Sequence, residues 1–168
     1  MTNIYHATPY DISATGFYFK TYEEYAEKAD SHINAYGDPV EEYEIQFIDG
    51  DNHELFKALG VTQANLEQWF DGFENLDGHE LECATYLAVY RGYDMDNLHD
   101  RIDDVHLFEG TAEDYAEEYL ESTGMLNEVP ESLRYYIDTK AFARDLLLGG
   151  DIEEVTINGT RYIAEAHF

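Results

Sequence analysis

The chain has 168 residues and a formal net charge of −28, because 37 Asp and Glu residues face only 9 Lys and Arg residues. Hydrophobic residues make up 44% of it and aromatic residues 15%, a content that disordered acidic tails lack. So negative a protein has too few cations to neutralise phosphates, which excludes direct binding to nucleic acid and to anionic membranes. The composition indicates a folded polyanion.

The sequence carries no sign of a membrane or export segment. No apolar run approaches the roughly 20 residues of a membrane-spanning helix, and Met1–His6 lacks the basic start of a signal peptide. The single cysteine, Cys83, cannot form a disulfide within the chain, which fits a reducing compartment. We therefore expect a cytoplasmic protein without a membrane partner.

Residues 1–60 are expected to form a small α+β unit. Thr21 followed by Glu24 is the sequence of a capping box and predicts the start of a helix. Asp49–Asn52 has the composition of a turn. The expected strands cover residues 3–7, 16–19 and 42–48.

Residues 61–103 are expected to form a central helical unit. Thr62 is a candidate cap for the first helix, and Gly92 is a candidate end for the second. The expected helices are Gln63–Phe70, Glu80–Arg91 and Met95–Asp104.

The last part of the chain predicts a second α+β unit. Val105–Phe108 is a candidate strand, and Thr111 caps a helix that runs to about residue 122. Pro130 precedes a helix that is expected to continue to residue 144 or 148, where Gly149 and Gly150 end it.

A β-hairpin is expected at the C-terminal end. Its strands cover residues 153–157 and 160–166, and Asn158-Gly159 between them is the favoured type I′ turn. The predicted fold class is therefore α+β, an elongated chain of three small units. Their boundaries are 1–60 for the N-terminal α+β unit, 61–103 for the central helical unit and 104–168 for the C-terminal α+β unit.

The helix after Thr111 shows how closely the acids are spaced. One face is apolar, and the other carries five carboxylates, those of Glu113, Asp114, Glu117, Glu118 and Glu121. They spread over about 12 Å of helix, or about one charge per 3 Å, close to the spacing of roughly 3.4 Å per phosphate along one DNA strand. A solvated face, adaptation to high salt and imitation of DNA all produce such a helix.

Acidic residues occur along the whole chain, since residues 1–60, 61–108 and 109–168 each carry far more acids than bases. This distribution describes a surface rather than one metal site or one catalytic pair. If the surface imitates DNA, the candidate residues are Glu23, Glu24, Glu27, Asp30, Glu41, Glu42, Asp71, Glu74, Asp77, Asp94, Asp96, Asp100, Asp103, Asp104, Glu113, Asp114, Glu117, Glu118 and Glu121.

Known catalytic and metal-binding patterns do not fit. Asp49–Glu54 begins like a calcium loop, but Glu54 stands where glycine is required and Gly60 where the bidentate Glu belongs. The seven His residues show no paired zinc spacing, and no phosphate-binding glycine loop or nucleophile motif occurs. Cys83 is expected to be a buried, inert thiol. The 15 Tyr residues are expected to pack in the core or between domains, with aromatic stacking sites as the alternative. We identify no active site, metal or cofactor and expect a protein that is not an enzyme.

The segment between residues 127 and 146 resembles a known family. It contains Val129-Pro130-Glu131, then Arg134-Tyr135-Tyr136-Ile137-Asp138, then Phe142-Ala143-Arg144-Asp145. This segment is similar to the antirestriction motif of the ArdA antirestriction proteins, which are carried by conjugative plasmids and transposons. Ile4-Tyr5, Thr62–Phe70, Ala84–Tyr90, the length and the acidity also fit, so the resemblance covers essentially the whole chain.

The resemblance implies more than the composition does. Proteins of this family are elongated, three-part homodimers that imitate bent B-form DNA and pair through their C-terminal parts. They occupy the DNA-binding groove of type I restriction–modification enzymes, so the partner expected here is the methyltransferase core of such an enzyme. We expect the dimer contact at Val105, Leu107 and Phe108, near the last hairpin, and a structural or dimer-forming role for the motif.

Two other functions stay open at this point. An acidic adaptor or sequestering module for basic nucleic-acid-binding proteins would have the same composition. A hydrolase that uses two carboxylates would need a pair of acids that nothing in the sequence marks.

Overall fold

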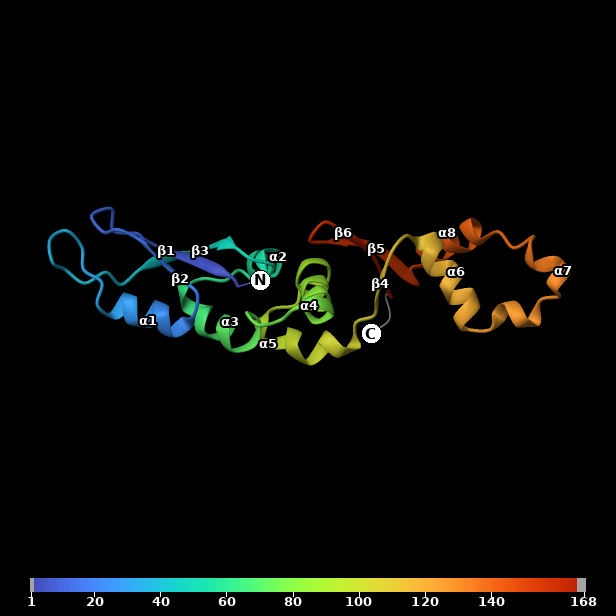
Figure 1. Ribbon diagram of the computed structural model, residues 1–168, viewed down its shortest axis with the longest axis horizontal. Helices are drawn as coiled ribbons and strands as arrows, with labels where there is room; N and C mark the ends of the chain where they lie inside the picture. The colour runs from blue at the N-terminus through green and yellow to red at the C-terminus, as the bar shows by residue number, and fades with distance from the viewer. Residues whose placement is uncertain (1, 166–168) are drawn as a thin grey trace. The chain divides into compact units, whose positions relative to one another are not determined.

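A computed structural model describes residues 2–165 of the chain. It contains helices and two small antiparallel sheets, so the predicted α+β fold class is confirmed (Figure 1). The chain divides into two compact units, Met1–Ile102 and Asp103–Phe168. The expected boundary after residue 60 falls inside the first of them, and the division into three parts stays a prediction.

The first unit combines a three-stranded sheet with five helices. In the sheet β1 lies in the middle, between β2 and β3, and both pairings are antiparallel. The elements are β1 (Ile4–Pro9), β2 (Phe17–Phe19), α1 (Tyr22–Asp30), β3 (Tyr43–Asp49), α2 (His53–Ala58), α3 (Leu66–Gly72), α4 (Gly78–Tyr90) and α5 (Met95–Leu98), with 3-10 turns at Gln63–Asn65 and His99–Asp104.

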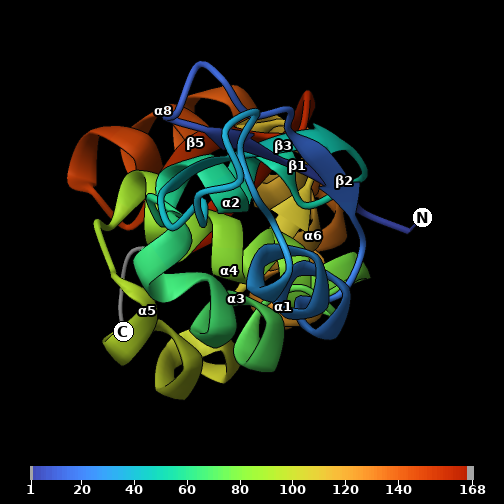
Figure 2. The same cartoon turned by 90° about the vertical axis from the view of Figure 1, so that its left-hand side faces the viewer.

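The core of this unit lies between the sheet and its helices. Figures 1 and 2 place α1 and α3 against the same face of the sheet. Tyr5 on β1 is fully buried there and stacks on Phe19 of β2, with ring centroids 5.4 Å apart. The indole Nε1–H of Trp69, on α3, donates a hydrogen bond of 2.9 Å to the Tyr5 hydroxyl. Sheet and helices are therefore joined by one buried polar contact among aromatic rings.

Helix α2 is an element that the sequence pattern failed to predict. Its first flanking residue, Asn52, would normally cap the helix with its side chain. Here that side chain is buried, where its Nδ2 donates to the carbonyl of Leu76 at 3.0 Å and its Oδ1 accepts a bond of 3.1 Å from Asn3. The capping residue is therefore present in the sequence, but its side chain makes tertiary contacts and forms no capping bond to α2.

In the second unit, two helices pack through small side chains onto another three-stranded sheet. Strand β6 lies between β4 and β5. The elements are β4 (Leu107–Glu109), α6 (Ala112–Ser122), α7 (Glu131–Arg134), α8 (Thr139–Gly149), β5 (Ile152–Ile157) and β6 (Thr160–Glu165), with a 3-10 turn at Met125–Glu128. The expected hairpin is confirmed, and both Asn158 and Gly159 adopt the positive φ that a type I′ turn requires.

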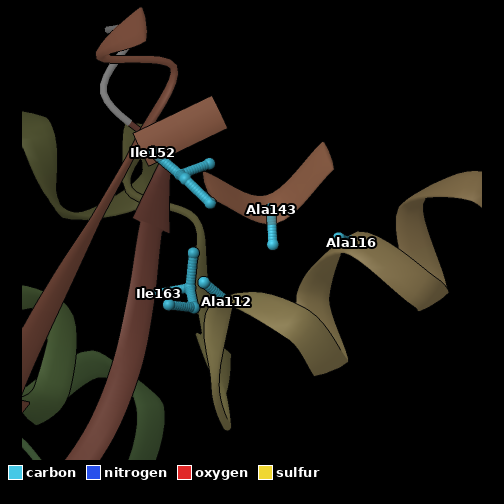
Figure 3. Close-up of a cluster of buried hydrophobic side chains, with 5 residues drawn as sticks. All are labelled: Ala112, Ala116, Ala143, Ile152 and Ile163. Carbon is cyan, nitrogen blue, oxygen red and sulfur yellow. The ribbon is translucent and has the colours of Figure 1, made fainter. Parts of the chain in front are cut away.

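Alanine side chains form the middle of this second core. Ala112 and Ala116 on α6 face Ala143 on α8, with Ile152 and Ile163 from the sheet beside them (Figure 3). Such small side chains allow the two helix backbones to approach closely. Larger side chains, among them those of Tyr115 and Phe142, pack against this cluster from outside and stay partly exposed.

The expected continuous helix from Pro130 to residue 144 or 148 is wrong. Helix α7 ends at Arg134, and α8 begins only at Thr139. Asp138 has an extended backbone, and its carboxylate accepts a bond of 3.0 Å from the N–H of Ala141, which caps α8. The apolar spacing suggested one helix, but Leu133 and Tyr136 are exposed and no core contact holds them in a common helix.

The contact between Trp69 and Tyr5 yields a first prediction. Tyr5→Phe leaves the buried indole N–H without its acceptor, so we expect the free energy of unfolding of the first unit to fall by about 1–3 kcal/mol. Urea unfolding followed by the fluorescence of Trp69, the single tryptophan, measures it. Tyr18→Phe is the control, because Tyr18 is exposed on the neighbouring strand. An equal loss in both variants would show that the buried bond contributes nothing specific.

Candidate functional site

All 37 acidic side chains are at least partly exposed. They all lie within residues 2–165, and none is buried, whereas the buried polar residues there are Asn3, Asn52 and Thr85. Burying an unpaired carboxylate costs roughly several kcal/mol. The chain has too few Lys and Arg residues to pair with all of its carboxylates. The acidic character of the composition is therefore a property of the surface of both units.

The expected DNA-like surface residues follow this rule. Sixteen of the nineteen candidates are exposed, and Glu24, Glu74 and Glu113 are partly buried. These three carboxylates bond or lie close to groups of their own chain. Glu24 pairs with Lys28, Glu74 accepts a bond from Asn3, and Glu113 lies 4.0 Å from the ammonium of Lys140.

Helix α6 is held in place by the capping box that the sequence predicts. The hydroxyl of Thr111 accepts a bond of 3.1 Å from the N–H of Asp114, and the Asp114 carboxylate accepts one of 2.9 Å from the N–H of Thr111. The Thr111 hydroxyl also donates a bond of 2.6 Å to the Asp114 carboxylate, and this bond, together with that from the Thr111 N–H, lowers the pKa of Asp114. Glu117, Glu118 and Glu121 remain exposed along the rest of the helix. Asp114 thus helps to cap the helix, and the carboxylates of Glu117, Glu118 and Glu121 stay exposed to solvent.

Helix α1 uses the same device with one difference. The hydroxyl of Thr21 accepts from the N–H of Glu24, as expected, but the Glu24 carboxylate accepts from the N–H of Lys20 rather than from that of Thr21. The ammonium of Lys28 donates a second bond to this carboxylate at 2.6 Å. The bonds from Lys28 and Lys20 lower the pKa of Glu24. Glu23, Glu27 and Asp30 stay exposed on the same helix.

The loop between α4 and the second unit adds further exposed acids. Asp94 caps α5, because its carboxylate accepts bonds from the N–H groups of Asp96 and Asn97. Asp100 and Asp103 follow on the 3-10 turn and are exposed. Asp94 is therefore held by the start of α5, and Asp100 and Asp103 stay exposed after it.

The segment that resembles the antirestriction motif has two structurally different halves. In the C-terminal half Asp138 caps α8, and Phe142 and Ala143 belong to the core or pack against it. In the N-terminal half Tyr135 and Tyr136 are 92% and 83% exposed. The first half of the motif therefore faces solvent, while the second holds the unit together.

The three basic residues of the motif bond within their own chain. The Nε–H of Arg134 donates to the carbonyl of Val129 at 3.1 Å, and Arg144 pairs with Asp145 at 3.2 Å. Lys140 lies near Glu113, as described above. Pro130 and Glu131 precede α7 or begin it and are exposed, and Ile137 is partly exposed. The three basic side chains of this segment therefore contact groups of their own chain and are not part of the acidic surface.

The residues expected at the dimer contact differ from one another in exposure. Val105 is buried, and Leu107 and Phe108 are partly buried. The Phe108 ring lies 5.7 Å from that of Tyr115, with its edge toward it. Strand β4 is an edge strand of its sheet. The dimer contact at this strand stays a prediction.

The cysteine and tyrosine side chains singled out in the sequence differ in their burial. Cys83 is buried on α4, and its sulfur lies 3.5 Å from Nε2 of His79. Within residues 2–165, no three His, Cys, Asp or Glu side chains are arranged to hold a metal ion. No helix of this part of the chain is long and apolar enough to cross a bilayer. Of the tyrosines that were expected to pack in the core or between domains, six are exposed, namely Tyr10, Tyr18, Tyr36, Tyr90, Tyr135 and Tyr136.

The comparison with known proteins assigns the class. Residues 10–160 match the family model described as ArdA, antirestriction protein. This match covers most of the chain, which defines it as an antirestriction protein. The chain belongs to the ArdA family, so the resemblance seen in the sequence is confirmed. No curated protein matches the chain.

The capping carboxylates predict how stability depends on pH. The folded pKa of Asp114 is lower than its unfolded value of 3.8, so the ionised group favours the folded state above that pH and the benefit is lost as the pH falls. Glu24 contributes with the same sign. We therefore expect the free energy of unfolding to fall as the pH drops below about 4.5, the higher of the two unfolded pKa values.

Asp114→Asn keeps an oxygen acceptor but cannot titrate, so its stability should fall less steeply over this range. Urea unfolding followed by circular dichroism measures the slope. Glu117→Gln, which removes an exposed charge from the same helix, is the control. An unchanged slope in Asp114→Asn would show that the capping bonds do not set the response.

Proposed function

We propose that this protein inhibits type I restriction–modification enzymes by occupying their DNA-binding groove as an imitation of duplex DNA. The observation that carries the proposal is the surface position of every carboxylate in a chain that belongs to an antirestriction family. Grooves that bind DNA present Lys and Arg to phosphates, and an array of carboxylates can occupy the same groups. The action takes place in the cytoplasm, where a restriction enzyme meets incoming DNA.

The mechanism is binding without any bond being made or broken. Carboxylates replace phosphates as partners of the groove and displace the counterions around them, so salt should weaken the complex. The large negative field speeds association with a positive groove. Because carboxylates carry no base edges, inhibition should not depend on the recognition sequence of the enzyme.

The helix geometry supports this distribution of charge. Glu117 and Glu121 are four residues apart on α6, about 6 Å along the helix axis. Two steps along a DNA strand cover roughly 7 Å. Glu23 and Glu27 repeat the interval on α1. Exposed acids at this interval resemble the charge density of a strand without requiring any one residue.

A competition assay tests the proposal. Labelled duplex DNA is held on the purified methyltransferase core of a type I enzyme, and the protein is titrated in at two salt concentrations. We expect displacement at near-stoichiometric protein, with any recognition sequence, and weaker displacement at the higher salt. If unrelated basic DNA-binding proteins bind the chain equally well and the core is not emptied, the adaptor function replaces the proposed one.

The distributed charge predicts small effects of single substitutions. Glu27→Gln should weaken displacement by less than about fivefold, because an exposed ion pair contributes roughly 0.2–1 kcal/mol. The triple variant Glu23→Gln, Glu27→Gln, Asp30→Asn should weaken it by about tenfold, since the small terms add. Thr21 and Glu24 are left in place, so circular dichroism should show an intact α1. Loss of all inhibition in the single variant would contradict a distributed surface.

We also propose that two copies of the chain pair through the second unit. The exposed half of the motif supports this, since Leu133, Tyr135 and Tyr136 present large apolar surfaces to solvent. Strand β4, with Leu107 and Phe108, is a second candidate because it lies at a sheet edge. The exposed tyrosines are favoured, since Val105 is buried and Phe108 already packs against the core of its own unit.

The pairing predicts a change in mass. In Tyr135→Ser, Tyr136→Ser the dimer dissociation constant should rise at least about tenfold, because buried aromatic side chains dominate interfaces. Sedimentation equilibrium measures it. Tyr36→Ser is a matched control, since Tyr36 is as exposed as Tyr136 but lies in the first unit. A parent protein that is monomeric at micromolar concentration would overturn the proposal, and a shift only in Leu107→Ser would place the contact at β4.

A further inference from the structure

Two adjoining hollows lie beside helix α6 in the second unit. Their volumes are about 180 and about 350 Å³, and both are lined by Tyr115, Tyr119 and Glu165. Phe108 and Glu118 also line the smaller hollow, with His106, Leu107 and Ser122 beside them. Phe142 and Asp151 also line the larger one, with Met125, Leu146 and Ile152 beside them. We call the surface formed by the four rings of Phe108, Tyr115, Tyr119 and Phe142 and the carboxylates of Glu118, Asp151 and Glu165 the aromatic trough.

The aromatic rings of the trough form a continuous row. The centroids of Phe108 and Tyr115 are 5.7 Å apart, those of Tyr115 and Tyr119 are 6.1 Å apart, and those of Tyr119 and Phe142 are 6.0 Å apart. All four rings are partly exposed, because the alanine cluster of Figure 3 fills the core beneath them. The core thus supports this row of rings and leaves ring surface accessible.

Carboxylates surround the row. The Tyr115 hydroxyl donates a bond of 3.0 Å to Glu165, which fixes that carboxylate beside the rings. Glu118 lies at the smaller hollow and Asp151 at the larger one. The Lys and Arg residues of the neighbouring helix α8 pair elsewhere, with Glu113 and Asp145. Neither hollow is lined by a described Lys or Arg side chain.

Aromatic rings with carboxylates beside them can bind a cationic side chain, because the rings contact its apolar stem and the carboxylates attract its charge. A guanidinium stacks on an aromatic face and donates in its own plane to carboxylates, whereas an ammonium stacks less well. A purely apolar occupant would strip water from the nearby carboxylates without compensation. Charge complementarity and ring geometry therefore both favour arginine.

We propose that the aromatic trough binds an arginine side chain of the protein's partner. The partner's identity, the DNA-binding groove of a restriction enzyme, rests on the proposed function, but the affinity for a guanidinium group does not. The trough adds a localised anchor to a surface whose other contacts are individually weak. DNA itself has no counterpart to it, so the trough would let the protein hold an arginine more tightly than a phosphate array does.

A small probe tests the site directly. The peptide acetyl-Gly-Arg-Gly-amide is titrated into the full chain, and tyrosine ring signals are followed by NMR. We expect saturable shifts of Tyr115 and Tyr119. Acetyl-Gly-citrulline-Gly-amide, which has the same shape without the charge, should shift them far less, and the lysine peptide should bind more weakly than the arginine peptide. Equal shifts with arginine and citrulline peptides, or no shift at these rings, would overturn the proposal.

Two neighbouring glutamates provide matched variants. Glu118→Gln should weaken binding of the arginine peptide by about tenfold, because it removes a charge-assisted contact at the trough. Glu117→Gln removes the same charge from the next residue of α6, which does not line either hollow, and should change binding by less than about twofold. Similar losses in both variants would show that the peptide is attracted by the general negative charge of the surface and not by the trough.

The same two variants separate this proposal from the proposed function. In the competition with DNA on the methyltransferase core, Glu118→Gln should be several-fold weaker than Glu117→Gln. If the arginine peptide binds and the two variants compete equally, the trough takes a guanidinium but not one from that enzyme. If the parent protein displaces no DNA while the peptide still binds, the proposed function fails and the trough stands.

Discussion

The desolvation of carboxylates is the constraint on which the rest of the structure depends. With 37 acids and 9 bases, ion pairing can neutralise only a small part of the charge, so every acid must stay in contact with water. The cores are therefore built almost entirely from aromatic, aliphatic and alanine side chains, with Asn3, Asn52 and Thr85 as the buried polar residues of the described chain. In the described residues the acidic side chains therefore lie at the surface, and none of them is buried in a core.

Some of the acids also stabilise the elements that carry them. The carboxylates of Asp94, Asp114 and Asp138 each accept a bond from a backbone N–H at the start of a helix, where a negative charge is favoured by the helix dipole. A charge that is unfavourable among its neighbours is thus favourable toward its own helix. This explains how helices with exposed acids at intervals of four residues persist with so few lysines between them.

The proposed function uses the same separation. A surface of exposed acids offers many weak contacts that any DNA-binding groove can accept, which gives breadth across enzymes of different sequence specificity. The aromatic trough would add one desolvated contact, and the exposed tyrosines of the motif would join two copies. Breadth and affinity would then depend on different residues, so substitutions could alter one without the other.

The sequence by itself determined the elements whose signals are local. The capping box at Thr111, the Asn158-Gly159 hairpin and the α+β class were predicted because each depends on residues a few positions apart. The surface position of the acids also followed, since desolvation forbids any other. Tertiary structure decided the rest. It gave the Asn52 amide to Leu76 and Asn3 rather than to α2, broke the motif helix at Asp138, and brought rings from β4, α6 and α8 into one row. Those outcomes depend on contacts between residues far apart in the chain, and no local pattern encodes them.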